Sequence, residues 1–497
     1  MTGTRAPTAG GDTVSHPQNL AGAFRPYPEY NDSELPWLGK IPKKWEIKRG
    51  KKIFREIDIR SKNGDEELLT VSAKYGVLPR KEKIVPMFKA ESYAGYKLCW
   101  PGDLVINSLW AWMHGLGFSR YHGIVSTAYG VYRPLENYSS YCSYFDYLLR
   151  SNAYDWELRV RSKGIWISRL QLLDAAFFDM PIIIPPEEEA KKIVAFIRFK
   201  KHYIRQYIRV KQHLIKLLTE QKQVIINNAV LRGIDNDNVK FKTSSLGWLK
   251  EIPQHWDEYS IAHISDVIQI GPFGSQLHAS DYTPNGTPVI NPCHLLGNTI
   301  IPDYNCAVSE KTVNRLLQHK LEQGDIILSR RGELGRCAIV EQSQIGWLCG
   351  TGCIRLSLKK EIIDPNYFVL LFSCQQSSEF LTLSSVGATM DNLNSEIVAR
   401  YRIPCPPGPE QIRILSFIAE EKDRIESIIA TARHEIELIQ EYHARLIADV
   451  VTGKVDVRNV EIVDDAPVVD DLVDAIDELD DNADDDVDGD DRDDENR

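Results

Sequence analysis

The amino-acid sequence predicts an α/β or α+β protein built as a two-globule repeat, with the globules separated by two long antiparallel coiled-coil helices. The segment IPPEEEAKKIVAFI at 184–197 aligns without a gap on CPPGPEQIRILSFI at 405–418, at an offset of 221 residues. WLGKIPKKW at 37–45 also shares five identical residues with WLKEIPQHW at 248–256, at an offset of 211. Such self-similarity indicates a duplicated frame, whose filling is ten residues longer in the second half.

The two helices are predicted from the residues after each Pro-Pro pair. Pro185–Pro186 and Pro406–Pro407 cannot lie inside a helix, whereas Glu187 and Glu410 place negative charge where a helix start favours it. About 45 residues of apolar repeat follow, which predicts a helix of roughly 65 Å that requires a partner helix. We expect the two helices to pack antiparallel, with the globules at opposite ends. The expected inter-helix seam consists of Ile193, Ile197, Ile204, Ile208, Ile215, Leu218, Ile225, Ile414, Ile418, Ile425, Ile429, Ile436, Ile439 and Leu446.

Each globule is predicted to contain short strands broken by turns, followed by one helix. In the first half we expect strands within 68–79, 99–107 and 123–134, with turns at Gly76, Gly102 and Gly130, and a helix at 141–151. In the second half we expect strands within 287–292, 322–331 and 349–358, and a helix at 364–374 that begins near Asp364. Both halves carry a Gly-Asp turn before an apolar strand, at 102–103 and 324–325.

Charge divides the chain into a mildly basic body and an acidic tail. Residues 464–497 hold 18 acidic and 2 basic residues, so the net charge of −11 leaves 57 basic against 52 acidic residues elsewhere. The tail has the composition of a disordered, solubilising segment. A sharper hypothesis is that the tail competes with DNA for basic surfaces. The modest basic excess of the body fits nucleic-acid binding through local patches.

The cysteines and the hydropathy indicate a soluble, cytoplasmic protein. Nine scattered cysteines suit a reducing compartment, and the sequence has neither a membrane-length apolar run nor an apolar signal core. Cys349 and Cys353 lack a second ligand pair at metal-site spacing. We therefore interpret them as structural thiols and expect no metal site.

The sequence lacks a recognisable catalytic set. GPFGS at 271–275 has no P-loop lysine, so its glycines permit close backbone approach either to another strand or to DNA. NPCH at 291–294 and DPNY at 364–367 are the nearest approaches to the Asp/Asn-Pro-Pro-aromatic motif of adenine methyltransferases, but both lack the second proline. DPNY also lies where a helix start needs an Asp cap. We expect no catalytic residue in this chain.

Basic, polar and aromatic residues cluster where loops and strand ends are expected, which is where binding groups usually lie. Arg and Lys grip phosphates or pair with guanine, while Gln and Asn suit adenine. As a group, the candidate DNA-binding residues are Lys74, Tyr75, Arg80, Lys81, Lys83, Arg120, Tyr121, Gly271, Phe273, Gly274, Ser275, Gln276, His278, Arg330, Arg331 and Arg336.

Taken together, these features resemble the specificity subunit of Type I restriction-modification systems. The resemblance spans about residues 35–458 and rests on the two Trp-containing openings, GPFGS with DYTPNGTPVI, PGDLVIN and QGDIILS, GIVSTAYGVYRP, the Pro-Pro-Glu helix entries, and the helix endings NNAVLRGID and ADVVTGKVD. It implies two target-recognition domains separated by two conserved helices. The expected divisions are an arm at 1–30, domain 1 at 31–181, helix 1 and linker at 182–244, domain 2 at 245–403, helix 2 at 404–458 and an acidic, disordered tail at 459–497.

The resemblance also implies a function in which each globule reads one half of a bipartite, asymmetric DNA target. The helices would fix the spacer, with the half-sites about one helical turn, or 10 bp, apart. Two methylation subunits would supply the S-adenosylmethionine site and modify adenine, and restriction subunits would cleave with ATP and Mg²⁺. This chain would bind no cofactor. The arm and the acidic tail are not part of the family's pattern.

Two other functions stay open on the sequence alone. The chain could be a stand-alone DNA adenine methyltransferase or nuclease, which the missing cofactor turn argues against and which unaided methyl transfer would establish. It could also be a coiled-coil interaction scaffold. Absent or salt-independent DNA binding by the reconstituted complex would favour the scaffold, because phosphate contacts weaken as salt rises.

Overall fold

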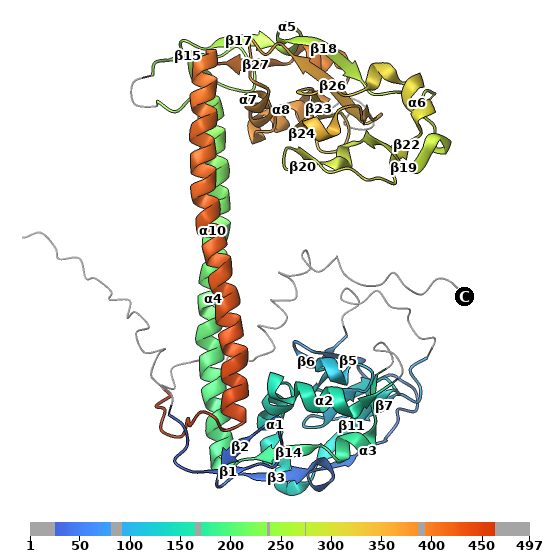
Figure 1. Cartoon of the computed structure of the whole chain (residues 1–497), viewed down its shortest axis with the longest axis vertical. Coiled ribbons are helices and arrows are strands. Elements are labelled where there is room, and N and C mark those ends of the chain that lie inside the picture. Colours follow the sequence, from blue (N-terminus) through green and yellow to red (C-terminus); the bar gives the residue numbers. More distant parts are fainter. Residues whose placement is uncertain are drawn as a thin grey trace, which may run out of the picture. The chain divides into compact units, whose positions relative to one another are not determined.

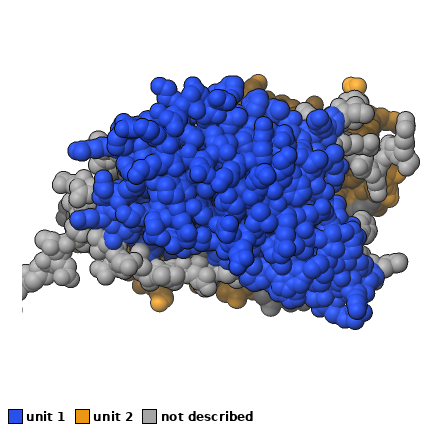
Figure 2. All heavy atoms as spheres, turned by 90° about the horizontal axis from the view of Figure 1, so that it is seen from below, with its two compact units in different colours: residues 1–210, 435–497 blue, residues 211–434 orange. Residues whose placement is uncertain are grey.

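The structure, a computed structural model, describes residues 25–80, 92–164, 170–235, 239–273, 275–385 and 393–462. These residues form two compact units, shown in blue and orange in Figure 2. Unit 1 comprises residues 1–210 and 435–497, and unit 2 comprises residues 211–434. Both boundaries fall within the two long helices, α4 (Glu187–Arg232) and α10 (Gly408–Val451), so each unit contains part of each helix.

Unit 1 is built on a four-stranded antiparallel sheet (Figure 1). Its strand order is β4 (Phe54–Glu56), β11 (Tyr129–Pro134), β8 (Leu104–Asn107) and β9 (Leu116–Phe118). The remaining strands form two-stranded pairs, namely β1 (Tyr30–Asp32) with β2 (Lys40–Pro42), β3 (Glu46–Arg49) with β14 (Pro181–Ile184), β5 (Leu69–Ser72) with β6 (Gly76–Pro79), β7 (Lys97–Cys99) with β10 (Gly123–Val125), and β12 (Ser162–Lys163) with β13 (Gln171–Leu172). The short helices are α1 (Cys142–Leu149), α2 (Asp155–Arg161) and α3 (Asp174–Phe178).

Unit 2 repeats this sheet in the same strand order. The order is β18 (Ser265–Ile270), β26 (Cys353–Leu358), β23 (Ile326–Ser329) and β24 (Cys337–Ile339), again antiparallel. The other strands are β15 (Phe241–Thr243) with β16 (Glu251–Pro253), β17 (Asp257–Ser260) with β27 (Arg402–Cys405), β20 (Leu295–Leu296) with β21 (Thr299–Ile300), and β22 (Ala307–Val308), β19 (Tyr282–Ile290) and β25 (Leu348–Cys349) as a third sheet. The short helices are α5 (Ile261–Ile264), α6 (Glu310–Arg315), α7 (Pro365–Phe372), α8 (Gln375–Ser385) and α9 (Ser395–Arg400).

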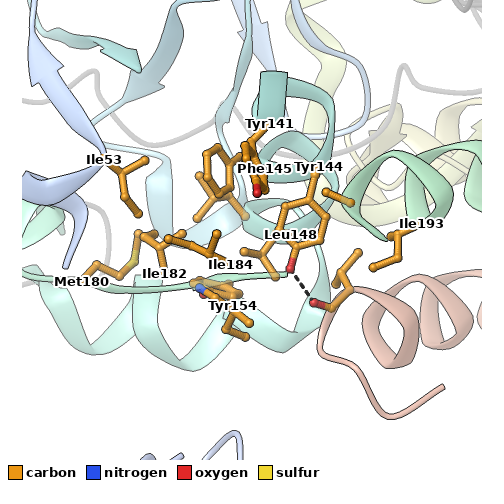
Figure 3. Close-up of a cluster of buried hydrophobic side chains, with 14 of the residues drawn as sticks. Ile53, Tyr141, Tyr144, Phe145, Leu148, Tyr154, Met180, Ile182, Ile184 and Ile193 are labelled. Carbon is orange, nitrogen blue, oxygen red and sulfur yellow. Dashed lines mark hydrogen bonds between the residues drawn. The ribbon is translucent and has the colours of Figure 1, made fainter. Parts of the chain in front are cut away.

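In each unit, one apolar core joins the globule to the long helices. In unit 1, Tyr144 of α1 is buried with the isoleucines of β14 and with Ile193 of α4, and its hydroxyl donates to Val451 O at 2.9 Å (Figure 3). In unit 2, Tyr367 of α7 is buried in the equivalent core and donates to Val230 O at 2.8 Å. Each large side chain buried in this way contributes about 1.5–3 kcal/mol. In each unit, the globule and its part of the long helices therefore share one core.

Five of the seam residues predicted from the sequence lie in the apolar cores of the two units, namely Ile193, Ile197 and Leu446 in unit 1 and Ile414 and Ile418 in unit 2. In unit 1 the helices run antiparallel, with Ile193 packed in one core with Val450 and with Tyr207 Oη 3.1 Å from Glu435 Oε2. In unit 2 the pairing is also antiparallel, with Lys222 Nζ 3.2 Å from Glu426 Oε1. Every predicted seam residue is buried or half-buried. The expected fold class, a repeated mixed globule with long antiparallel helices, is confirmed.

One turn predicted from the sequence is wrong. Gly76 and Gly102 have positive φ values of 75° and 90° and form the expected turns, but Gly130 lies within β11. A Cβ atom at Gly130 would lie 2.4 Å from the hydroxyl oxygen of Tyr132. Gly130 is therefore required by the space that the buried Tyr132 ring occupies, which no local pattern predicts.

Candidate nucleic-acid interface

The Gly-Asp turn of each unit holds a buried ion pair that fixes the sheet from which the candidate interface projects. In unit 1, Asp103 is 1% exposed and accepts hydrogen bonds from Arg133 Nε (2.7 Å) and Nη2 (2.8 Å), and from the backbone N–H of Trp100 (2.9 Å). The Asp103 carboxylate raises the pKa of Arg133. Because Asp103 precedes β8 and Arg133 lies in β11, the pair locks two central strands together.

Unit 2 repeats this pair at an offset of 222 residues. Asp325, also 1% exposed, accepts from Arg355 Nε at 2.6 Å, from Ser357 Oγ at 2.8 Å and from the N–H of Glu322 at 2.8 Å. Arg355 is 9% exposed, compared with 32% for Arg133. Both oxygens of each carboxylate accept hydrogen bonds from the frame, so the two aspartates have a structural role.

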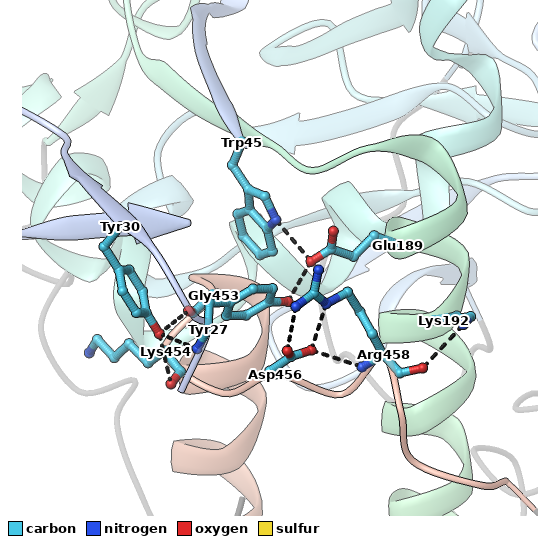
Figure 4. A network of polar contacts seen from close by, with 9 residues as sticks. All are labelled: Tyr27, Tyr30, Trp45, Glu189, Lys192, Gly453, Lys454, Asp456 and Arg458. Carbon is cyan, nitrogen blue, oxygen red and sulfur yellow. Dashed lines mark hydrogen bonds and ion pairs between the residues drawn. The ribbon is translucent and has the colours of Figure 1, made fainter. Parts of the chain in front are cut away.

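The start of each long helix is held by a buried tryptophan. In unit 1, Trp45 Nε1 donates to Glu189 Oε1 at 3.0 Å, and the Tyr27 hydroxyl donates to the same oxygen at 2.5 Å (Figure 4). Burial and the Glu189 carboxylate raise the pKa of Tyr27. Arg458 lies over the Tyr27 ring and pairs with Asp456. A carboxylate in the first turn of a helix is also stabilised by the helix dipole.

The same arrangement recurs in unit 2, where a histidine rather than a tyrosine is the second side chain on the carboxylate. Trp256 Nε1 donates to Glu410 Oε1 at 3.1 Å, while His255 Nε2 lies 2.7 Å from Glu410 Oε2. Trp45 and Trp256 are the final tryptophans of the two repeated openings. Their identity is explained by this indole-to-carboxylate contact, which orients each globule on a helix start.

The candidate DNA-binding residues of unit 1 lie on two neighbouring elements. Lys74 and Tyr75 form the turn between β5 and β6, where Lys74 Nζ lies 5.0 Å above the Tyr75 ring. Arg120 and Tyr121 lie just beyond β9, after Ser119, and the β5–β6 hairpin packs on β9. Arg80 follows β6. The other two predicted residues of this unit, Lys81 and Lys83, lie outside the described residues.

The candidates of unit 2 fall into two groups that adjoin one backbone turn. Gly271 N donates to Cys353 O at 3.0 Å and Arg330 N donates to Gly352 O at 3.0 Å, so both groups start beside residues 350–353. Arg330 is 6% exposed, and its Nε donates to Leu393 O. Arg331 is exposed, and Arg336 pairs with Glu333. Phe273 is 60% exposed, and Ser275, Gln276 and His278 are exposed as well, whereas Gly274 lies outside the described residues.

The structure supports one of the two interpretations of the GPFGS loop, close approach to other backbone of the chain, for its first glycine. A Cβ atom at Gly271 would lie 1.9 Å from Gly350 O, so this glycine permits close approach to the backbone of the turn between β25 and β26. The role in capping is also confirmed for DPNY, because Asp364 caps α7 and accepts from Asn366 N at 2.7 Å. NPCH is a cap of the same kind, since Asn291 and His294 form a capping box.

Burial explains Cys349 and Cys353, and turn formation explains a cluster of histidine, aspartate and cysteine side chains at 294–306. Burial raises the pKa of Cys349 to about 12 and also raises the pKa of Cys353, which suits inert structural thiols. The ligating atoms of His294, Asp303 and Cys306 lie within 4.8 Å of one another. However, His294 Nδ1 accepts from Asn291 N at 3.1 Å, and Asp303 Oδ1 accepts from Asn305 N at 2.8 Å. The ring nitrogen that carries the lone pair is therefore already used in the turn.

Sequence reasoning missed a difference between equivalent connections of the two sheets. The connection between β8 and β9 carries Trp110 and Trp112, stacked with ring centroids 6.3 Å apart, and Trp110 is 54% exposed. The equivalent connection between β23 and β24 carries Arg330, Arg331 and Arg336. The aromatic run LWAWM was a signal in the sequence, but only the shared strand order shows that it replaces the basic segment.

Comparisons with known proteins agree with this architecture. A family model described as the Type I restriction modification DNA specificity domain matches residues 253–438. The MjaVIII specificity subunit of a Type I restriction enzyme from Methanocaldococcus jannaschii is 23% identical over 61% of this chain and 68% of the relative. The MjaIX specificity subunit from the same organism is 26% identical over 38% of this chain and 42% of the relative. A solved chain from a type I R-M system, described in terms of complex assembly and conformational transition, shares the fold with a TM-score of 0.55 at 16% identity, covering 84% of this chain and 99% of that chain.

Proposed function

Because the chain belongs to the family of Type I restriction-modification specificity subunits, which recognise DNA sequence, we propose that its two units read two different half-sites of one bipartite, asymmetric target. The observation that carries this proposal is the repeated frame with unlike fillings. The sheet order, the buried Asp–Arg pair and the Trp–Glu contact recur in both units. The loops that project from this frame differ, as the aromatic and basic sheet connections demonstrate. Two units that share a frame but differ in their loops can recognise two different half-sites.

In this proposal the chain is non-catalytic and directs partner subunits. The buried carboxylates of the frame, Asp103, Asp325, Glu189 and Glu410, are each engaged by an arginine or a tryptophan, so they are not poised for proton transfer. Two methylation subunits would supply S-adenosylmethionine and modify adenine. Restriction subunits would supply ATP- and Mg²⁺-dependent cleavage. This chain would bind none of these cofactors.

The long helices are the proposed docking surface for the methylation subunits and the ruler for the spacer. The unit 1 part of the helices exposes Val210, Leu438 and Tyr442 at 67%, 51% and 38%. The unit 2 part exposes Leu214, Leu217, Val224, Ile412, Phe417 and Ile428. Large apolar side chains in solvent on a long helix favour burial by another protein. Helices of 46 and 44 residues are long enough to separate half-sites by about one turn of DNA.

Two features of the chain agree with a cytoplasmic location, which we include in the proposal. All nine cysteines are free thiols, as expected in a reducing compartment. Among the described residues, no helix combines the length and the apolar character that crossing a membrane requires.

Genomic methylation tests the proposed function directly. DNA from cells with and without the gene would be sequenced on a single-molecule platform that scores modified adenines. We expect a split motif, of three or four bases, a fixed gap and four or five bases, to lose its modification on deletion. If no modified motif depends on the gene in cells that express the partner subunits, the scaffold function replaces this proposal. Methyl transfer by the purified chain alone would instead establish an enzyme.

The acidic tail is proposed to weaken non-specific DNA binding by competing for basic surfaces. A chain that ends at residue 463 should bind a random-sequence duplex more tightly at low salt, and the difference should vanish as salt rises. Unchanged affinity at low salt would show that the tail only solubilises the protein.

A further inference from the structure

A hairpin in each unit lies outside the main sheet and packs on an equivalent edge strand of that sheet. In unit 1 this is β5–β6, paired from Leu69 with Pro79 to Ser72 with Gly76, with a three-residue loop at 73–75. In unit 2 it is β20–β21, with a two-residue loop at Gly297–Asn298. The first hairpin packs on β9 and the second on β24, which are equivalent edge strands. Figure 1 labels β5 and β6 of the first hairpin, and β20 and β24 of the second pair.

Backbone chemistry makes both turns rigid. Gly76, the first residue of β6, has a φ of 75°, which glycine adopts without strain, and Ser72 Oγ accepts the N–H groups of Lys74 and Tyr75. Gly297 and Asn298 have φ values of 55° and 66°, the left-handed pair of a type I′ turn. Each tip therefore presents its side chains in a fixed orientation.

A side chain at the C-cap of an equivalent helix holds each turn. Arg150, which follows α1, donates from Nη2 to Ala73 O at 2.9 Å and to Lys74 O at 2.6 Å. Arg150 Nη1 also contacts Asp146, whose other oxygen accepts from Phe118 N of β9. The hairpin tip, α1 and the sheet edge are thereby joined in one network.

In unit 2 the corresponding contact is made by Ser373, the C-cap of α7, whose Oγ accepts from Asn298 Nδ2 at 3.3 Å. α1 and α7 are the same helices whose tyrosines, Tyr144 and Tyr367, are anchored on the long helices. Both tips are therefore positioned from the common frame, although their sequences share nothing.

The exposed groups of the two tips differ in chemistry, and basic residues flank both. The unit 1 tip presents the exposed Lys74 above the half-buried Tyr75 ring, and the exposed Arg120 lies just beyond the neighbouring strand. The unit 2 tip presents Leu296, 47% exposed, and Thr299, and Arg336 precedes the neighbouring strand. Flanking cations suit phosphate contacts, while a two-stranded ribbon fits the major groove, where base edges and thymine methyl groups are read.

We propose that the β5–β6 and β20–β21 hairpins are equivalent base-reading elements that enter the major groove, one at each half-site, and that Arg150 is a positioning residue for the first. This inference rests on the proposed function and names the structural element that performs it. Lys74 and Tyr75 read bases of one half-site, and Leu296 and Thr299 read bases of the other.

The test uses the full chain with its partner subunits in the source cell, with the modified adenine motif as the readout. Lys74→Ala and Tyr75→Ser should broaden the bases accepted in one half-site by about tenfold to a hundredfold in relative methylation, and leave the other half-site unchanged. Leu296→Ala with Thr299→Ala should broaden the opposite half-site. Lys48→Ala is the matched control, because Lys48 lies 5.6 Å from the Tyr138 ring as a second Lys–Tyr pair of unit 1. The control should leave the motif intact.

Each outcome separates this inference from the proposed function. If the motif persists with both half-sites unchanged in the tip variants, or if one tip alters both half-sites, the hairpins are not the readers and the inference is wrong while the proposed function stands. If no motif depends on the gene, the proposed function itself fails. Melting temperatures of the purified variants guard against misfolding, and Tyr75→Phe, which keeps the ring, should retain most discrimination.

The role of Arg150 is tested by Arg150→Lys, since a lysine cannot span both turn carbonyls in the same way. We expect the ratio of methylation on the correct sequence to that on single-base variants of the first half-site to fall about tenfold, with the melting temperature nearly unchanged. A lower melting temperature with an unchanged ratio would show that Arg150 only stabilises the fold.

Discussion

The most quantitative consequence of the repeated frame is an unequal cost for removing its two buried aspartates. The Asp325 carboxylate is 1% exposed and accepts hydrogen bonds from Arg355, Ser357 and the N–H of Glu322, and Asp325→Ala removes all three. It leaves Arg355, 9% exposed, with only the exposed Glu322 carboxylate at 3.2 Å. Removing one partner of a buried ion pair costs about 3–5 kcal/mol, because the other charge stays buried without compensation. We expect the free energy of unfolding of unit 2 to fall by that amount.

Asp103→Ala should cost less, although the hydrogen bonds that it removes are similar. The Arg133 side chain is 32% exposed, so water can replace part of the lost carboxylate. We expect a loss of about 1.5–3 kcal/mol in unit 1, the range for hydrogen bonds to charged groups. The difference between the units arises from the exposure of the arginine alone.

Hydrogen exchange followed by mass spectrometry measures both units in one experiment, because the opening free energy is read separately for peptides from β8 and β11 and from β23 and β26. The double variant Asp325→Leu/Arg355→Met is the control, and it should regain much of the loss since no charge stays buried. The reasoning is refuted if Asp325→Ala lowers the opening free energy by less than about 1 kcal/mol, or if the two aspartate variants cost the same.

Three further predictions follow from single contacts. Burial and nearby cationic side chains of α4 lower the pKa of His443 to about 4. Because His443 takes up a proton near pH 6.5 in the unfolded chain, the free energy of unfolding should fall as the pH drops from about 6.5 towards 4. His443→Leu should remove that loss, as measured by urea unfolding between about pH 7.5 and 5. Glu410→Ala leaves the buried indole N–H of Trp256 without its acceptor. The melting temperature should therefore drop by the few degrees that correspond to about 1–3 kcal/mol. An unchanged melting temperature would show that another group replaces the carboxylate. Gly453→Ala should destabilise the protein more than Gly233→Ala, although both glycines have positive φ. A Cβ atom would lie 2.4 Å from a proline ring carbon at Gly453, but 3.2 Å from its nearest neighbour at Gly233. Equal midpoints of the two variants in chemical unfolding would contradict this prediction.

The frame could be predicted from the sequence because its determinants are repeated. The offsets of 211 and 221 residues placed Trp45 and Trp256, and the two helix starts, in equivalent positions before any contact was known. The apolar spacing predicted the two long helices, and the Gly-Asp turns were predicted at Gly102 and Gly324, where the structure has positive φ values of 90° and 86°. Local chemistry determines each of these features.

The contacts between distant residues could not be predicted in this way. Asp103 is buried because Arg133 lies opposite it in another strand, and Gly130 is a glycine because the Tyr132 ring occupies its space. The β20–β21 hairpin was overlooked because its strands are only two residues long, although Gly297–Asn298 between apolar residues is a turn signal. The assignment of Lys74, Arg120, Gln276 and the other candidates to DNA stays a prediction, since base contacts depend on a bound duplex.

The central claim, that two units read two half-sites independently, is tested most directly by exchanging residues 31–181 for the corresponding globule of another specificity subunit and sequencing the modified adenines in cells that carry the hybrid. The account predicts a new motif in which one half is replaced while the other half and the modification of adenine are retained. A motif that changes in both halves would contradict the claim that each unit recognises its half-site on its own.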